Sequence, residues 1–292
     1  MKKAYLQLHT AVLLWGFTAI LGKFIVLTGL ILVWWRMGLT TASLLALSGV
    51  RREAAALPRR SRWQLGGIGL LVMLHWVAFY SAVKASNASI AVSGLATTSF
   101  MTAFLEPLLL RTRIKWYEIG LGLLIMPGIY FLFSVDFVGS QLGLVLSLLA
   151  AFLAALFSTL NKAMVAGVHP YAITFYEIGA GWVGLSVIVP FFIVSQHAAF
   201  VPDWSSLGWL VVLCVCCTTF PFIISLSALK HISSFAANLA INLETVYTIL
   251  IAWLFLGENK QLTTHFYIGI VIIMLAVLAH PFVKQMVEGK AA

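Results

Sequence analysis

Charged residues are scarce in this sequence. Asp, Glu, Lys and Arg make up 9% of its 292 residues, whereas 62% are hydrophobic, and the mean hydropathy is +1.02. No stretch is polar enough and long enough to form a separate soluble domain. The composition therefore indicates an integral membrane protein.

Motifs for ATP binding and hydrolysis are missing as well. The sequence contains neither G-x-x-x-x-G-K-[ST], which binds the phosphates of ATP, nor H-E-x-x-H, which binds zinc. The two aspartates, Asp136 and Asp203, fall in predicted connections between apolar runs. We expect neither an ATP-driven pump nor an enzyme.

Cysteine is also rare. Cys214, Cys216 and Cys217 form a C-x-C-C cluster inside an apolar run, with no neighbouring histidine or acid. We interpret them as small buried apolar residues rather than as a metal or redox site. The sequence predicts no bound metal and no cofactor.

Long apolar runs dominate what the sequence does contain. A helix needs about 20 mostly apolar residues to cross a hydrocarbon layer of ~30 Å. Runs such as "GLVLSLLAAFLAALF" are continuous rather than alternating, which excludes a transmembrane β-barrel. We predict an all-α fold of ten transmembrane helices at residues 4–27, 30–49, 66–84, 88–110, 117–134, 141–163, 170–195, 207–230, 234–256 and 265–283.

Basic residues are distributed unevenly over the predicted connections. Lys23, Lys84 and Lys260 fall on one side of the membrane, and Arg36 falls inside a span. The other side has Lys2, Lys3, Arg51, Arg52, Arg59, Arg60, Arg62, Arg111, Arg113, Lys115, Lys162, Lys230, Lys284 and Lys290. Because basic residues accumulate on the cytoplasmic side, both termini are predicted to be cytoplasmic. This topology accounts for the net charge of +9 without a nucleic-acid partner.

The two halves of the chain resemble each other weakly. "WGFTAILGK" ending at Lys23 aligns with "AALFSTLNK" ending at Lys162, and "SAVK" ending at Lys84 aligns with "SALK" ending at Lys230. The second register also aligns Ala91 with Ala237 and Thr102 with Thr248. Because each half has an odd number of spans, equivalent connections lie on opposite sides of the membrane. We predict two inverted five-helix repeats, residues 1–136 and 137–292, an architecture found in secondary transporters.

The chain resembles the drug/metabolite transporter superfamily and, within it, the EamA-type ten-helix transporters. The resemblance is carried by "LLWGFTAILGK", "WWRMG", "LFLGENK", "GLGLLIMPGIY" and "YIGIVIIMLAV". It implies a multi-pass protein of the bacterial inner membrane that exports amino acids or related small metabolites by alternating access. Family members often have a proline early in the fourth and ninth spans. Here Thr98 with its neighbours and "LET" stand there instead, so the resemblance gives no ground for a helix break.

Residues near the middle of the spans are the candidate substrate site. An ionisable group at mid-membrane costs roughly 2.5–3.5 kcal/mol on insertion scales, so it normally faces the bundle interior. A rise of about 1.5 Å per residue places Glu244, His75 and Trp15 near the midplane. The predicted substrate-binding residues are Trp15, His75, Trp76, Tyr80, Asn238, Asn242, Glu244 and Tyr247. Their aromatic character suits an amphipathic solute with an apolar part, and titration of Glu244 or His75 would couple transport to protons.

Angular positions divide the polar residues of the ninth span. On a straight helix Asn238, Asn242 and Thr245 share one stripe, and Glu244 points about 160° away from it. We therefore expect only one of these faces to line the pathway. The asparagines either join helices by hydrogen bonds or line a cavity, and Glu244 either bonds a neighbouring group or serves function.

The fourth span carries small residues at intervals of four, Ser89, Ser93 and Thr97. Small residues let helices approach closely, so we predict that the fourth span packs against the ninth near the symmetry axis. Hydroxyl groups facing the substrate are the alternative.

Charged residues nearer the two faces form the candidate gates. Glu106, Lys162 and Glu177 lie within about two turns of the predicted cytoplasmic face and together would form an inner gate. Lys23 and Arg36 lie near the outer face, with Glu258 as a predicted partner. Snorkelling side chains and static ion pairs are the alternatives for all of them.

Two other classes of function compete with a transporter. An intramembrane enzyme would need a nucleophile and a base at a recognisable spacing, and the spans show none. A channel or scaffold is the other alternative, but the polar centre is too sparse for a filter built from charged rings. The partners we predict are therefore a small-molecule solute, membrane lipid and protons as a coupling ion.

Overall fold

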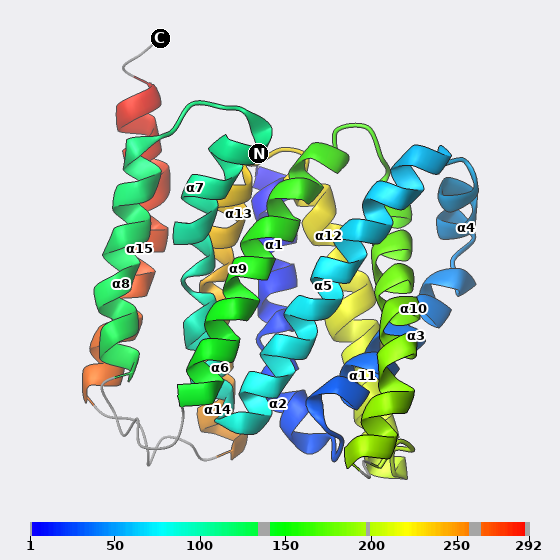
Figure 1. The fold of residues 1–292 in the computed structure, drawn as a ribbon. Helices are drawn as coiled ribbons and strands as arrows, with labels where there is room; N and C mark the ends of the chain where they lie inside the picture. The colour runs from blue at the N-terminus through cyan, green and yellow to red at the C-terminus, as the bar shows by residue number, and fades with distance from the viewer. Residues whose placement is uncertain (1, 134–140, 197–198, 257–263, 290–292) are drawn as a thin grey trace.

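The computed structural model describes residues 2–133, 141–196, 199–256 and 264–289, and these residues form helices and contain no strand. The helices run side by side as a bundle, and α1 begins at the same end at which α15 ends, here called the Lys2 end (Figure 1). The helices are α1 (Lys2–Trp15), α2 (Thr18–Phe24), α3 (Gly29–Ala46), α4 (Ser48–Ala55), α5 (Arg59–Ala85), α6 (Ala88–Leu95), α7 (Thr98–Leu110), α8 (Trp116–Phe133), α9 (Gln141–Met164), α10 (Pro170–Gln196), α11 (Trp204–Cys214), the π-helix η1 (Val215–Thr219), α12 (Phe220–Leu229), α13 (Ser234–Ile241), α14 (Leu243–Leu256) and α15 (Thr264–Glu288).

The predicted all-α fold is confirmed. Every predicted span coincides with one helix or with a series of shorter ones. Seven of the described segments are long and apolar enough to cross a membrane. They are Lys2–Phe24, Gly29–Ala46, Arg59–Ala85, Gln141–Met164, Pro170–Ser195, Trp204–Leu229 and Tyr267–Val287. Ten crossings and cytoplasmic termini stay predictions.

Three predicted spans are broken near their middle. The first divides at Gly16–Phe17 into α1 and α2, the fourth at Ala96–Thr97 into α6 and α7, and the ninth at Asn242 into α13 and α14. The straight ninth helix that the angular argument assumed is therefore wrong. In the register that aligns Ala91 with Ala237, Ala96 aligns with Asn242, so the fourth and ninth spans break at equivalent positions.

Threonine hydroxyl groups bond backbone carbonyls at the breaks in the first and fourth predicted spans. A break leaves carbonyl groups without their helical partners, and in a membrane protein these must be satisfied internally. The Oγ1 atoms of Thr18 and Thr97 donate to the carbonyls of Trp15 and Gly94 at 2.6 and 2.8 Å. Thr248 donates to the carbonyl of Gly16 at 3.0 Å. Threonine hydroxyls therefore satisfy backbone carbonyls at breaks that contain no proline.

The fourth and ninth predicted spans pack against each other, as the sequence predicted. The half-helix α7 contacts α13 toward the Lys2 end, and α6 contacts α14 toward the opposite end. The two spans run in opposite directions (Figure 1). The side chains of Ser89, Ser93 and Thr245 lie outside the described ones. The pairing places all three broken helices next to one another in the bundle.

Candidate substrate site

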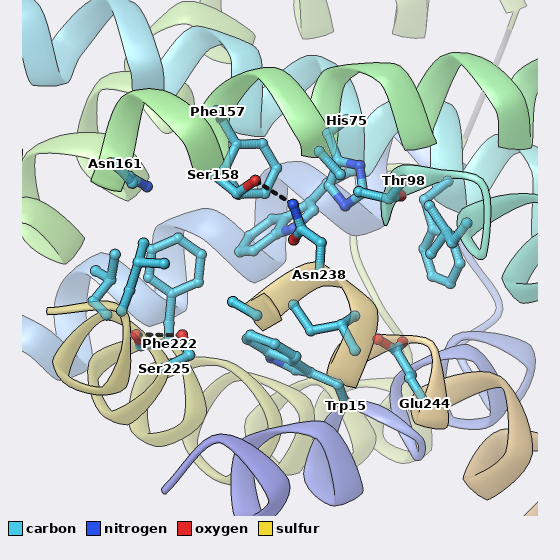
Figure 2. Close-up of a pocket in the computed structure, with 18 of the residues that line it drawn as sticks. Trp15, His75, Thr98, Phe157, Ser158, Asn161, Phe222, Ser225, Asn238 and Glu244 are labelled. Atoms are coloured by element: carbon cyan, nitrogen blue, oxygen red, sulfur yellow. Dashed lines mark hydrogen bonds between the residues drawn. The ribbon is translucent and has the colours of Figure 1, made fainter. Parts of the chain in front are cut away.

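A cavity lies in the middle of the bundle, between α1, α5, α9, α12 and α13 (Figure 2). The space open to the centres of water molecules is about 130 Å³. Since roughly 10–15 Å³ by this measure holds one water, the cavity has room for a small organic molecule. Its walls are mostly apolar and aromatic, with a few polar groups pointing inward, which is typical of sites for small molecules.

The three broken helices converge on this cavity. The lining residues that flank the breaks are Trp15 and Thr18, Leu95 and Thr98, and Ile241 and Glu244. Broken helices give the chain polar backbone groups in the membrane interior, and transporters place their substrate sites at such points. The breaks therefore mark the cavity as the candidate site.

Arg36 lies in the wall of the cavity and is 3% exposed. Its Nε donates to Thr218 Oγ1 and its Nη1 to the hydroxyl of Tyr80, both at 2.9 Å. The guanidinium carbon lies 3.9 Å from the ring centroid of Trp76, close enough for a cation–π interaction. The structure thus places Arg36, predicted near the outer face, in the cavity wall with three partners around its guanidinium, and gating by Arg36 stays a prediction.

The π-helix η1 holds one of these partners in position. Thr218 lies within η1 and donates its hydroxyl to the carbonyl of Leu213 at 2.7 Å, which leaves its oxygen to accept from Arg36. Single π-turns inside α-helices occur frequently at functional sites. The Cys214 thiol lies beside them and donates to the carbonyl of Arg36 at 3.4 Å.

Glu244 lies in the wall of the same cavity and is 9% exposed. Among the residues that the structure describes, no ion pair joins it to Arg36 or to any other basic side chain. An acid and a base thus face one cavity without neutralising each other. A solute that carries both charges would complement both.

The asparagines of the ninth span have two different roles. Asn238 lines the cavity and donates from Nδ2 to Thr102 Oγ1 at 2.8 Å and to Ser158 Oγ at 2.7 Å (Figure 2). Asn242 donates to Ser99 Oγ at 3.1 Å and joins α7 instead. We expected only one of the two polar faces of this span to line the pathway. That expectation is wrong, because the helix breaks at Asn242 and both Asn238 and Glu244 line the cavity.

Comparison with known proteins agrees with this architecture. The family model described as the EamA-like transporter family matches residues 2–134 and again residues 141–279. The chain belongs to the EamA-like transporter family. Among solved structures 26 chains match, and one of them, described as "Crystal structure of protein", has a TM-score of 0.77 at 14% identity and covers 99% of both chains. At that identity the likeness shows the fold alone. No curated protein matches the chain.

The family match bears on two predictions. The two matched segments confirm a chain of two EamA repeats, and with the apolar helices they make the protein a multi-pass integral membrane protein. The repeat boundaries at 136 and 137 stay predictions.

Aromatic and imidazole side chains complete the candidate site of this EamA-like protein. Trp15, His75 and Trp76 line the cavity as predicted. The Nδ1 atom of His75 lies 2.7 Å from the carbonyl oxygen of Ala150, and this hydrogen bond holds one edge of the imidazole ring against α9. His75 also lies edge-on to Phe157, with ring centroids 5.4 Å apart.

Three predicted substrate-binding residues lie outside the cavity wall, namely Asn242, which joins α7, and the tyrosines Tyr80 and Tyr247. Tyr80 is fully buried behind it and contacts the lining residues Arg36 and Thr18 through hydrogen bonds of its hydroxyl group. Tyr247 packs beyond the cavity, toward the end opposite Lys2, against the buried pair Ile20 and Ile251. Both tyrosines lie one side-chain layer away from the space that a solute would occupy.

Sequence reasoning missed several polar residues of the cavity, Ser158 and Asn161 among them. Both belong to "AALFSTLNK", which the sequence analysis used only to align the repeats. Their spacing of three places them on one face of α9 and was the available signal. Thr98 was also missed, because it was considered only as a replacement for proline.

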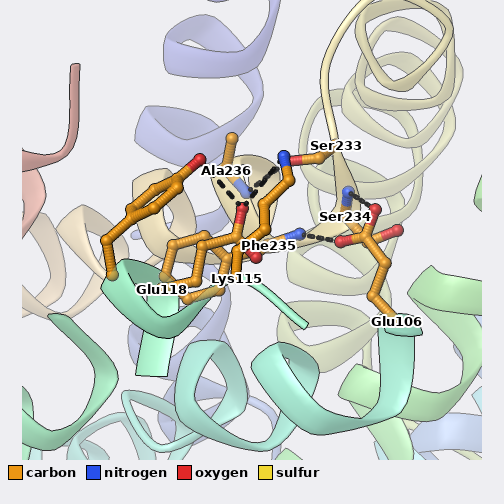
Figure 3. Close-up of polar contacts among 8 residues, drawn as sticks. Glu106, Lys115, Glu118, Ser233, Ser234, Phe235 and Ala236 are labelled. Carbon is orange, nitrogen blue, oxygen red and sulfur yellow. Dashed lines mark hydrogen bonds and ion pairs between the residues drawn. The ribbon is translucent and has the colours of Figure 1, made fainter. Parts of the chain in front are cut away.

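The predicted inner gate does not form one cluster of ion pairs. Glu106 accepts from the backbone N–H groups of Ser234 at 3.3 Å and Phe235 at 2.8 Å (Figure 3). Lys162 donates to the carbonyl of Leu229 at 2.7 Å, at the end of α12. Glu177 is completely buried beside α9. Two of the three therefore bind the backbone ends of neighbouring helices, and gating stays a prediction for each.

The predicted outer gate is only partly described. Lys23 is exposed near the end of α2, at the end of the bundle opposite Lys2. Its predicted partner Glu258, like Lys260, lies outside the described residues. Gating by Lys23 stays a prediction.

Polar contacts join α7 to α13 in a ladder from the Lys2 end to the cavity. Its steps are Glu106 with Ser234 and Phe235, Thr102 with Asn238, and Ser99 with Asn242. In the equivalent contact between α6 and α14, Val92 and Ala96 take the places of the two asparagines. Their side chains have no group that can donate or accept a hydrogen bond.

Replacing Glu106 by alanine is expected to destabilise the transporter by about 1–3 kcal/mol, because two part-buried N–H groups lose a charged acceptor. Thermal unfolding of the purified protein in detergent measures the loss. The matched control is Glu53→Ala, which removes a carboxylate from the exposed Arg52 pair on α4. Equal unfolding temperatures for the two variants would contradict this role of Glu106.

Proposed function

We propose that this EamA-like protein is a secondary transporter of a small amphipathic metabolite, an amino acid or a close relative, in the bacterial inner membrane. The observation that carries the proposal is that Arg36 and Glu244 face one cavity, unpaired with each other, where three broken helices meet. A carboxylate suits the guanidinium of Arg36, and an ammonium group suits Glu244. A zwitterion supplies both groups at once.

The apolar part of the solute also has a place in this proposal. Trp15, Phe157 and Phe222 contribute aromatic surface to the same cavity (Figure 2). Burial of apolar surface contributes affinity of about 25 cal/mol per Å². An amino acid with a large apolar side chain fits this wall better than a small polar one.

An apolar cluster supports a barrier between the site and the end opposite Lys2. There Phe17, Ile20, Phe24, Tyr247 and Ile251 pack into an apolar cluster beyond the cavity. Alternating access requires such a barrier on one side of the site at a time. With the Lys2 end on the cytoplasmic side, this arrangement would load solute from the cytoplasm, which supports export as the direction of transport.

Counterflow in proteoliposomes tests the proposal. We use L-phenylalanine as the probe, because it combines a zwitterion with an aromatic side chain. Purified protein in vesicles loaded with unlabelled L-phenylalanine is expected to take up labelled L-phenylalanine transiently and saturably. Glu244→Gln is expected to reduce the apparent affinity at least 10-fold, because the ammonium group loses its countercharge.

The outcomes separate the alternatives. Flux that does not saturate and shows no counterflow would indicate a pore, and chemical conversion of the probe would indicate an enzyme. Full transport by Glu244→Gln would remove Glu244 from the site. Competition with unlabelled amino acids, sugars and nucleosides then narrows the class of solute.

A further inference from the structure

A second buried carboxylate lies directly behind the cavity wall. Glu177 on α10 is 0% exposed, and its Oε2 accepts from the side-chain amide of Asn161 at 3.1 Å. Its other oxygen, Oε1, has no hydrogen-bond partner. Asn161 itself is 1% exposed and lines the cavity, and its Oδ1 also lacks a partner. The carboxylate is thus one residue away from the solute.

No countercharge accompanies Glu177 among the described residues. The basic groups on the helices packed against α10 have other partners: Arg36 bonds Thr218 and Tyr80, and Arg62 donates to the carbonyls of Ala55 and Leu57. On α4, Arg51 donates to the carbonyl of Leu45 and Arg52 pairs with Glu53. On α5, Lys84 donates to the carbonyl of Ile25 and His75 lies against the carbonyl of Ala150. Arg59 and Arg60 at the start of α5 are exposed. On α9, which carries Asn161, Lys162 donates to the carbonyl of Leu229. The charge of an ionised Glu177 would therefore remain uncompensated.

The helix that carries Glu177 packs closely against α5. Its backbone lies against Gly69 of α5, where a Cβ atom would come within 2.8 Å of the Glu177 Cα. An uncompensated charge in a membrane protein is strongly unfavourable, so a bound cation must neutralise it. A proton needs a single acceptor oxygen, whereas hard metal cations need about six or more oxygen ligands. The described residues contain no group of three or more His, Cys, Asp or Glu that could hold a metal ion.

We propose that Glu177 binds and releases the proton that is coupled to solute movement, and that Asn161 connects it to the substrate site. This inference rests on the proposed transport function. The proton enters Oε1 from the aqueous phase on one side and leaves to the other, and no bond in the solute changes. When Glu177 is ionised, its carboxylate binds the Asn161 amide more strongly, because a charged acceptor strengthens a hydrogen bond. Solute in the cavity and proton on Glu177 thereby act on the same asparagine.

Infrared difference spectroscopy tests the proton site without any solute. Spectra of the wild-type protein at two pH values are expected to contain the C=O stretch of a protonated buried carboxyl that is absent from Glu177→Gln and shifted in Glu177→Asp. The aspartate variant keeps the acid and remains informative if the glutamine variant fails to fold. A spectrum in which Glu177→Gln retains every carboxyl band of the wild type would overturn the proposal.

Transport under an imposed pH gradient tests coupling. Wild-type vesicles are expected to accumulate L-phenylalanine against its concentration gradient, with a luminal pH dye reporting the accompanying proton flux. Glu177→Gln is expected to retain counterflow within about 3-fold but to lose accumulation and proton flux, whereas the surface control Glu53→Gln keeps all three. This size of change follows if Glu177 does not itself contact the solute.

The possible failures are distinguishable. Absence of counterflow in the wild type speaks against the proposed function, and the infrared result still decides the proton site. Counterflow without pH-driven accumulation in the wild type, accumulation driven by a sodium gradient instead, or full accumulation by Glu177→Gln would each overturn Glu177 as the coupling site.

Discussion

Replacing Arg36 by glutamine is expected to abolish transport of L-phenylalanine at micromolar to low millimolar concentrations. Removing one partner from a buried, hydrogen-bonded charge interaction costs about 2–5 kcal/mol. That corresponds to a fall in affinity of roughly 30-fold or more. We expect Arg36→Gln to lower the affinity more than Glu244→Gln does. Three neighbours hold the guanidinium of Arg36 in one geometry before the solute binds, and the glutamine variant loses this preorganised charge.

The three contacts of Arg36 explain why lysine is not an adequate replacement. The guanidinium carbon lies 3.9 Å from the Trp76 ring centroid while two different nitrogens donate to Thr218 and Tyr80. An ammonium group is a point charge without that fork, so it cannot keep the stacking and both bonds together. Arg36→Lys is expected to bind the probe weakly, between wild type and Arg36→Gln, and Thr218→Val is expected to weaken binding without removing the charge.

Binding and folding are measured separately for these variants. L-Phenylalanine is expected to raise the unfolding temperature of the wild-type protein in detergent, since a ligand that binds only the folded state stabilises it. Arg36→Gln should lose this rise. Arg60→Gln, which changes an exposed arginine at the start of α5, is the matched control and should keep it. An equal ligand-induced rise in both variants would show that Arg36 does not bind the solute.

The depth of the site followed from the sequence, because the apolar runs fix where the middle of each span lies. Counting along those runs placed Trp15, His75 and Glu244 near one level, and the structure brings these three side chains to one cavity. Hydropathy carries this information because the membrane imposes a length on each helix. Apart from the fourth and ninth spans, whose small residues indicated close approach, the sequence did not predict which helices lie side by side.

The orientation of side chains could not be predicted in the same way. A straight helix turns Glu244 away from Asn238, but one residue of irregular backbone at Asn242 changes that angle. The break is stabilised by contacts between distant residues, such as the Asn242 bond to Ser99. Arg36 is a similar case, since Thr218 is far from it in sequence and reaches it only because η1 interrupts its helix. Long-range partners decided both outcomes.

The contact between α5 and α10 predicts the second large effect, at Gly69. A Cβ atom at this position would lie 2.8 Å from the Cα atom and 2.9 Å from the carbonyl carbon of Glu177, and closer still to its carbonyl oxygen. Carbon atoms pack best about 3.5–4.0 Å apart, and backbone atoms cannot rotate out of the way. Gly69→Ala therefore has to separate the two helices.

Gly69→Ala is expected to destabilise the protein by about 1–3 kcal/mol, the usual cost of overpacking, in spite of the gain in helix propensity. Gly67→Ala is a matched control on the same helix, because nothing lies within 4 Å of the Cβ it would add. That variant should be as stable as the wild type or more stable by up to about 1 kcal/mol. The difference in unfolding temperature between the two alanine variants measures the contact alone, since propensity affects both equally. Equal temperatures would mean that α5 and α10 do not approach as closely as this contact requires, and the confinement of Glu177 between them would fail with it.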